Sequence, residues 1–106
     1  MSDTLVRIQM LVGRGDIATS VHRFRELAAD DILLDDVIGG GGAAIVIENY
    51  PEAFKGPSVL VLQRDRDGKP MQIVRGIPKG VDGPATIITA YRPKPSRWSG
   101  DFMRRR

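Results

Sequence analysis

His22 is the first residue of this sequence to consider for moving a proton in a reaction. His22 is the one histidine, and imidazole is the side chain whose ordinary pKa lies closest to neutrality. An expected position near a helix N-terminus, beside Arg23 and Arg25, would lower the pKa of His22 and leave a neutral imidazole able to act as a general base. A lone histidine on a helix is more often a structural or surface residue, and spacing alone identifies no Ser-His-Asp triad. His22 is therefore the first candidate catalytic residue.

A basic stretch with two aromatic rings begins at Tyr91 and includes Lys94. Arginine presents a planar fork of donors that suits phosphate, and aromatic rings stack on bases. Together with the basic tail at 99–106, the stretch predicts a nucleic-acid or phosphate-binding surface. The candidate residues for this surface are Arg25, Arg75, Arg92, Arg97 and Trp98. In the alternative interpretation, Trp98 and Phe102 cover the edge of a sheet and the arginines are solvated.

The charges are distributed unevenly along the chain, whose net charge is +3. Residues 1–62 carry five basic and nine acidic side chains, whereas residues 63–106 carry eleven basic and four acidic ones. Twelve of the sixteen cations are arginine. A basic second half is compatible with RNA, with DNA or with an acidic partner protein, and equally with a charge surplus that serves solubility.

Metal and cofactor chemistry finds little support in the composition. The sequence has no cysteine, which excludes disulfides, thiolate zinc sites, iron–sulfur clusters and cysteine nucleophiles. One histidine cannot build a two-histidine metal site within one chain. Asp30, Asp31, Asp35 and Asp36 cluster around one expected helix start, whereas metal-dependent nucleases need acids that converge from strands and loops. We therefore expect no metal site and no cofactor.

The run of four glycines at 39–42 differs from a phosphate-binding loop. Such a loop follows a strand, precedes a helix and carries a lysine. Here the glycines follow an expected helix, precede an expected strand and include no lysine. They predict a flexible connection between helix and strand.

Apolar spacing predicts helices in the first part of the chain. Residues 4–12 fit a helix or a strand, and the helix is favoured because Asp3 or Thr4 can cap its start. Residues 16–20 predict a short connection or an edge strand. Two further helices are expected, one over 21–29 and a shorter one over 32–38.

Strands are expected in the remainder, with short connections that favour antiparallel pairing. They cover residues 43–49, 58–64, 71–77 and 85–91. A tight turn is expected at Asp67-Gly68. The tail around Trp98 is expected to form one or two helical turns that pack back on the sheet.

These elements predict an α+β fold with two or three N-terminal helices packed on one face of an antiparallel sheet of about four strands. The length predicts a single domain over 1–106. No apolar run approaches the ~18 residues that span a bilayer. The first residues also lack the pattern of a secretory signal. We expect a cytoplasmic protein that does not contact a membrane.

Several motifs occur in a specific order along the chain, from Ser20-x-His22 through the segments 45–51 and 68–74 to Thr89-x-Tyr91-x-Pro93. In the order and spacing of these motifs, the chain resembles the bacterial family called domain of unknown function 4258. That family starts with a Ser-x-His-Ala-x-x-Arg-Met helix and ends on a Thr-x-Tyr-x-Pro strand followed by a tryptophan. The resemblance covers about residues 16–98.

The resemblance implies a small α+β fold related to the RelE/ParE-like and BrnT-like toxins of toxin–antitoxin pairs. RelE-like members of that group cut messenger RNA on the ribosome with basic and tyrosine side chains and without a metal. The resemblance therefore implies Tyr91 as the second candidate catalytic residue, beside His22. One position departs from the family pattern, because Glu26 stands where the family has an arginine four residues after the motif histidine. If that arginine binds a phosphate in the family, this chain lacks the arginine and therefore that phosphate contact.

Three functions remain open on the sequence. The first is a non-catalytic interaction module on a RelE-like fold, bound by RNA, by an antitoxin-like partner protein at an exposed strand edge, or by a second copy of the chain. The alternative is a metal-independent RNA-cleaving toxin in which the ribose 2′-OH attacks. There His22 would be the acid or base, while Arg75, Arg92 and Tyr91 would hold phosphate or stack on a base. A metal nuclease or small-molecule enzyme is the third.

Overall fold

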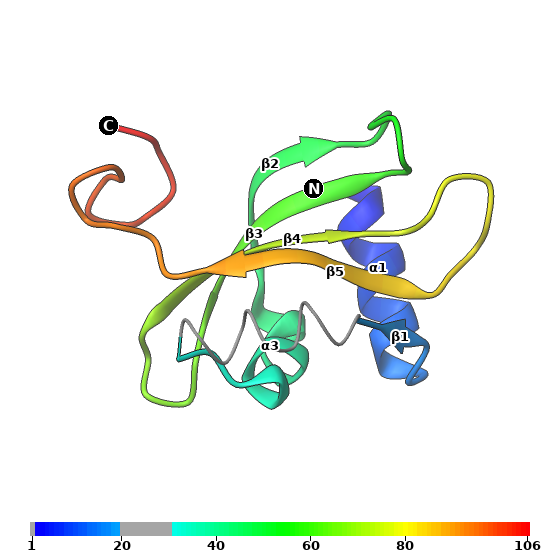
Figure 1. Cartoon of the computed structure of the whole chain (residues 1–106), viewed down its shortest axis with the longest axis horizontal. Coiled ribbons are helices and arrows are strands. Elements are labelled where there is room, and N and C mark those ends of the chain that lie inside the picture. Colours follow the sequence, from blue (N-terminus) through cyan, green and yellow to red (C-terminus); the bar gives the residue numbers. More distant parts are fainter. Residues whose placement is uncertain (1, 20–30) are drawn as a thin grey trace.

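The computed structural model describes residues 2–19 and 31–106 (Figure 1). The expected helix over 21–29, and with it His22 and Arg25, lies outside the described residues. The described elements are α1 (Asp3–Gly13), β1 (Ile17–Ala18), α3 (Leu34–Gly39), the 3-10 helix η1 (Gly41–Ala43), β2 (Ile45–Tyr50), β3 (Ser58–Arg64), β4 (Pro70–Gly76) and β5 (Ala85–Tyr91).

The fold is α+β, as predicted, but the sheet differs from the prediction in strand number and direction. It has five strands in the order β1-β5-β4-β3-β2. The last four pair antiparallel, whereas Ile17 and Ala18 of β1 pair parallel with β5. The prediction of an all-antiparallel sheet of about four strands was wrong because a two-residue strand carries no periodicity. The alternative of an edge strand within 16–20 is confirmed.

The helix predicted over 4–12 is confirmed as α1. Its cap is Ser2 rather than Asp3 or Thr4, because the Ser2 hydroxyl accepts a hydrogen bond from the Leu5 amide at 3.1 Å. This bond satisfies one of the amides that a helix start leaves without a partner. Leu5, Ile8 and Leu11 form the buried face of α1, at the spacing of one helical stripe.

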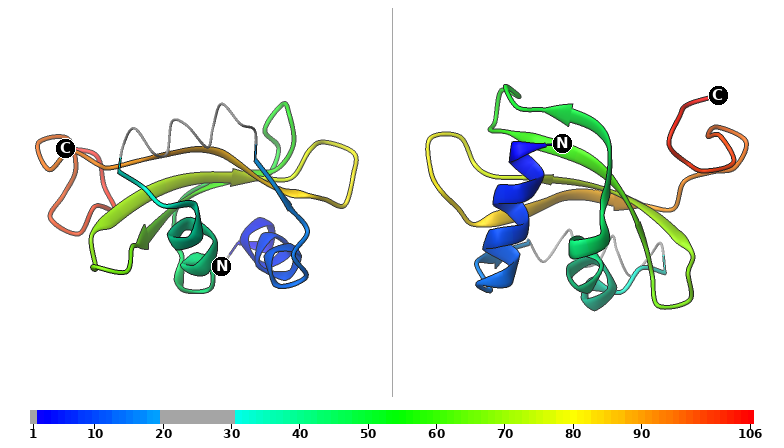
Figure 2. Two further views of the ribbon diagram at one scale, coloured as in Figure 1. Left: turned by 60° about the horizontal axis from the view of Figure 1, so that its bottom comes forward. Right: turned by 180° about the vertical axis from the view of Figure 1, so that it is seen from behind.

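One hydrophobic core lies between the sheet and the two described helices. Figure 2 shows that α1 and α3 cover the same face of the sheet. Side chains alternate between the two faces of a strand, so Met71 and Ile73 of β4 join this core, whereas Gln72 and Val74 lie on the opposite face. The buried core residues are Leu5, Ile8, Leu11, Ile32, Val37, Val59, Val61, Met71, Ile73, Ile77, Ala85 and Ala90.

The predicted strands and connections are confirmed within two residues. The turn between β3 and β4 contains Asp67 and Gly68, and Gly68 adopts a φ of 79° that favours glycine. Asp65 holds this turn, because its carboxylate accepts from the amides of Asp67 and Lys69, each at 2.9 Å. The glycine run ends α3, forms most of η1 and leads into β2, so it is a helix-to-strand connection.

The tail does not form the expected helical turns. Instead it folds back on itself, and Trp98 pairs with Arg105 in an isolated antiparallel bridge. Gly100 disfavours a helix here, and Phe102 has a φ of 60° that interrupts one. Among the described residues, no helix has the length and apolar character needed to cross a membrane.

Candidate nucleic-acid interface

A hollow of about 940 Å³ lies where the chain leaves β5 and the tail folds back. We call it the basic–aromatic groove. In Figure 1 this tail, coloured orange to red, lies at the opposite end of the sheet from α1. The described residues that line the groove include no acid. They are Tyr91, Arg92, Pro93, Lys94, Pro95, Ser96, Arg97, Trp98, Arg105 and Arg106.

The tail builds one wall of the groove by pairing with the segment that follows β5. The Arg106 amide donates to Arg97 O at 2.9 Å, and Arg106 Nε donates to Pro95 O at 3.0 Å. The Arg105 guanidinium lies over the Trp98 ring, 5.0 Å from its centroid, in cation–π geometry. Trp98 is itself buried, with 6% of its surface exposed. Its ring therefore supports the wall, and Arg105 presents the charged surface.

A carboxylate on β2 fixes Arg105 in this position. Arg105 Nη1 donates to Glu48 Oε1, and the Tyr50 hydroxyl donates to Glu48 Oε2. The Tyr50 hydrogen bond lowers the pKa of Glu48, burial opposes this effect, and Arg105 adds to the lowering. Glu48 is therefore ionised at neutral pH, and Arg105 is held while much of its side chain remains exposed.

Tyr91 lines the groove and keeps its proton at neutral pH. Burial raises the pKa of its phenol, Arg105 opposes this and Glu48 adds to it. Tyr91 can therefore donate a hydrogen bond or stack on a base, and it could serve as a general acid. Its raised pKa makes it a poor general base near neutrality.

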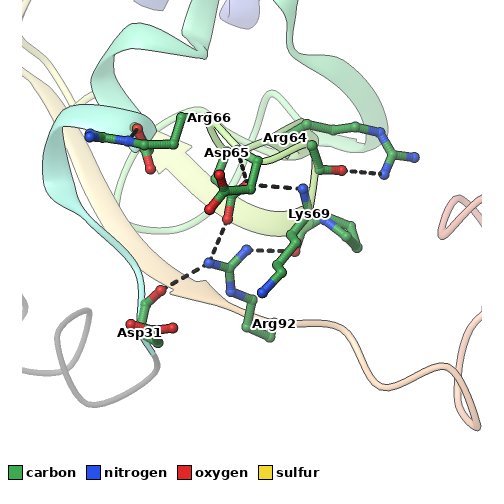
Figure 3. Close-up of polar contacts among 10 residues, drawn as sticks. Asp31, Arg64, Asp65, Arg66, Lys69 and Arg92 are labelled. Atoms are coloured by element: carbon green, nitrogen blue, oxygen red, sulfur yellow. Dashed lines mark hydrogen bonds and ion pairs between the residues drawn. The ribbon is translucent and has the colours of Figure 1, made fainter.

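Arg92 lies at the edge of the groove, but its guanidinium binds groups of the protein (Figure 3). Nη2 donates to Asp65 Oδ2 at 2.8 Å and to Asp31 O at 2.9 Å, while Nη1 donates to Pro70 O at 3.2 Å. Each contact is to another part of the chain, so Arg92 ties the end of β5 to the β3–β4 turn. A phosphate would have to compete with these acceptors.

The structure places Arg75 away from the groove. Along β4, Arg75 shares the helix-covered face with Met71 and Ile73, whereas Gln72 pairs with Tyr91 on the opposite face. Arg75 is 2% exposed. Four of the predicted residues therefore meet at the groove, which are Tyr91, Arg92, Arg97 and Trp98. His22 and Arg25 lie outside the described residues.

Two members of the groove were not among the candidate site residues, although the basic tail that contains them was predicted to join this surface. Arg105 and Arg106 belong to the predicted basic tail, but nothing in their spacing indicates that they return to Trp98 and Arg97. The expected helical tail would have directed them elsewhere. Within the described part of the chain, no group of three or more potential metal ligands is close enough to hold an ion.

The comparisons with known proteins identify a family over most of these elements. The model of the family described as domain of unknown function (DUF4258) matches residues 19–92. The chain belongs to this family. No curated protein and no solved structure matches the chain. The predicted relation to RelE/ParE-like and BrnT-like toxins therefore remains a prediction.

The DUF4258 match covers only some of the described elements. It contains α3 and strands β2 to β5, whereas α1, β1 and the tail lie outside it. Of the groove, Tyr91 and Arg92 lie within the DUF4258 match and the other lining residues follow it. The groove is thus formed by a family strand and by chain beyond the match.

Proposed function

We propose that this protein is a non-catalytic module that binds single-stranded RNA in the basic–aromatic groove. The observation that carries the proposal is the composition of the groove, where five cations and two aromatic rings meet without an acid among the described lining residues. Such grooves bind the backbone electrostatically and the bases by stacking.

The cations of the groove have different roles in this proposal. Arg92 pairs with Asp65, and Arg105 pairs with Glu48. Each ion pair holds its arginine in place and offsets its positive charge, so these two arginines add little net charge to the groove. Lys94 and Arg97 are exposed and form no ion pair with a described residue. These two side chains provide the electrostatic attraction for phosphate. Tyr91 and the outer face of the Arg105 guanidinium provide flat surfaces on which bases stack.

Binding is favoured over cleavage by the chemistry of the described lining residues. None of them has a side chain whose ordinary pKa lies near neutrality, and the pKa of Tyr91 is raised by burial. The alternative, a metal-independent RNA-cleaving toxin of a toxin–antitoxin pair, requires His22 as acid or base. Loss of intact RNA in the binding experiment would favour that alternative.

The experiment is a titration of a fluorescein-labelled oligouridylate with the full chain, followed by anisotropy at several salt concentrations. We expect the double variant Lys94→Ala/Arg97→Ala to bind about tenfold more weakly and with a shallower salt dependence, because two phosphate contacts are lost. The matched control is Arg7→Ala/Arg14→Ala, which removes the same charge from exposed positions in and just after α1. Equal weakening by both variants would show attraction to net charge and contradict a specific groove.

A protein partner is the second candidate, favoured by the open edge of β2. This strand has one neighbour in the sheet and exposes Ile45, of which 56% is accessible. A strand from an antitoxin-like protein or from a second copy of this chain could pair there, although the bulge between Val46 and Glu48 shortens the regular edge. Monomeric elution at all concentrations in size-exclusion chromatography would contradict the homodimer.

A further inference from the structure

A second cavity, of about 250 Å³, lies between α1, the glycine run and β4. Its walls are mostly aliphatic, and Leu5, Ile8 and Val12 of α1 form one side. Gly39, Gly41 and Gly42 form another, and Gln9 Nε2 braces this wall against α1 by donating to Gly41 O at 3.1 Å. Arg75 is the charged residue among the described lining.

The guanidinium of Arg75 is buried with neutral acceptors. Nε and Nη2 donate to Gln63 Oε1 at 3.0 Å and 2.7 Å, and Nη2 also donates to Val37 O. Among the described residues, no carboxylate pairs with Arg75 and no acceptor bonds to its Nη1. A buried cation usually has an anionic partner, because desolvation is costly without one.

The guanidinium of Arg75 borders the cavity beside the glycine run. A Cβ placed on Gly41 would lie 3.4 Å from Arg75 Nη2 and 4.0 Å from Nη1, so the guanidinium lies directly beneath bare backbone. Gly39 and Gly42 also line the cavity, and a Cβ on either residue would meet no atom within 4 Å. Burial also lowers the pKa of Arg75 to about 10, because desolvation disfavours the charged guanidinium.

We propose that this cavity binds a small aliphatic monocarboxylate, whose carboxylate pairs with Arg75 and whose short tail packs on Leu5, Ile8 and Val12. One uncompensated positive charge matches one negative charge, and a phosphate dianion would bring a second charge with no cation to meet it. The aliphatic wall selects a hydrocarbon tail, and the volume limits the tail to a few carbons. The site lies on the opposite face of the sheet from Tyr91, so it is separate from the proposed RNA groove.

The test is calorimetric titration of the full chain with hexanoate, with hexanol and inorganic phosphate as comparison ligands. We expect saturable binding of one hexanoate per chain in the millimolar range or tighter, and at least about tenfold weaker binding of hexanol, because the alcohol lacks the charge-assisted contact. Equal affinity for hexanol, tighter binding of phosphate, or no binding of hexanoate at millimolar concentration would each overturn the proposal.

Two variants test the site without removing Arg75. Gln63→Glu places a carboxylate of nearly the same shape beside the guanidinium, so it should weaken hexanoate binding at least about tenfold by supplying the missing charge internally. Gly42→Leu should have the same effect, because Gly42 lines the cavity and a larger side chain there reduces its volume. Gly100→Leu, at a position that does not line the cavity, should leave hexanoate binding unchanged. Unchanged hexanoate binding in Gln63→Glu and Gly42→Leu, with both variants folded by circular dichroism, would contradict the assignment.

Discussion

Arg92 Nη2 donates to Asp65 Oδ2 at 2.8 Å, and the same carboxylate holds the amides of Asp67 and Lys69 through its other oxygen. A single aspartate therefore shapes the β3–β4 turn and anchors the end of β5 to it. Because the groove begins at Tyr91, immediately before Arg92, this ion pair fixes the position at which the groove starts.

The Asp65 carboxylate should stabilise the fold in a pH-dependent way. Burial alone would raise its pKa, but hydrogen bonds from the Lys69 amide, from Arg92 and from the Asp67 amide together lower it below its ordinary value. A carboxylate with a lowered folded-state pKa contributes stability above its unfolded-state pKa, and that contribution is lost as the pH falls through the lowered value. We expect Asp65→Asn to lower the urea midpoint at about pH 7 and to match the parent protein at about pH 2. A constant difference across this range would contradict the ionic role.

Gly56 should tolerate no side chain. Its φ is 130°, and a Cβ would lie 2.0 Å from Ile77 O and 2.7 Å from the Lys79 amide nitrogen. Gly56→Ala therefore forces the two loops at this end of the sheet apart, and we expect a loss of about 3 kcal/mol or more in the free energy of unfolding. Chemical denaturation measures the loss. Gly100→Ala is the control, since a Cβ there meets nothing within 4 Å, and an equal effect of both variants would contradict this explanation.

Tyr91 should contribute its ring to RNA binding and not its hydroxyl. We expect Tyr91→Ala to cost about 1–3 kcal/mol of binding free energy by removing a stacking surface, and Tyr91→Phe to bind within about twofold of the parent. Anisotropy titration with the labelled oligouridylate provides both values. If Tyr91→Phe instead abolishes cleavage of the RNA while leaving its binding unchanged, the hydroxyl acts as a general acid and the RNA-cleaving alternative is favoured.

Trp98 is the one tryptophan of the chain, so its fluorescence reports directly on the groove. The Arg105 guanidinium lies over the indole ring of Trp98, 5.0 Å from the ring centroid. We expect Arg105→Ala to shift the emission to longer wavelength and to increase quenching by acrylamide, because the indole becomes accessible to water. The neighbouring exposed residue gives the control, Arg104→Ala, which should leave the spectrum unchanged. An unshifted spectrum in Arg105→Ala would show that other groups cover the ring.

Much of the fold could be predicted from the sequence because its strands are apolar, β-branched runs bounded by turn residues. β3, β4 and β5 begin and end within a residue of their predicted bounds. Residues 4–12 fitted a helix or a strand, and the favoured helix is confirmed as α1. The parallel pairing of β1 could not be predicted, since two residues carry no pattern and their partner strand is distant in the sequence. The tail that carries Trp98 and Phe102 was expected to form one or two helical turns, and Gly100 between these residues disfavours a helix.

The candidate site was predictable where its residues lie close together in the sequence. One short segment of the chain contains Tyr91, Arg92, Arg97 and Trp98, so they can line the same groove without contacts between distant parts of the chain. The position of Arg75 could also have been inferred, because alternation from Met71 and Ile73 directs it into the core. The ion pair between Arg92 and Asp65 could not be predicted from the sequence, because it depends on how the β3–β4 turn lies against the end of β5.

The two-residue pairing of β1 with β5 also has a consequence for the order of folding. It joins Ile17 to Ala85, so a very long loop must close for little gain in bonding. We therefore expect this edge to form last and to open first, while the β3–β4 hairpin, whose strands are separated by a short turn, forms early. During synthesis on a ribosome, α1 emerges long before β5, the strand that completes the sheet against which it packs. The apolar face of α1 therefore stays exposed to water until most of the chain has been synthesised. A chaperone would be most useful to the protein during this interval.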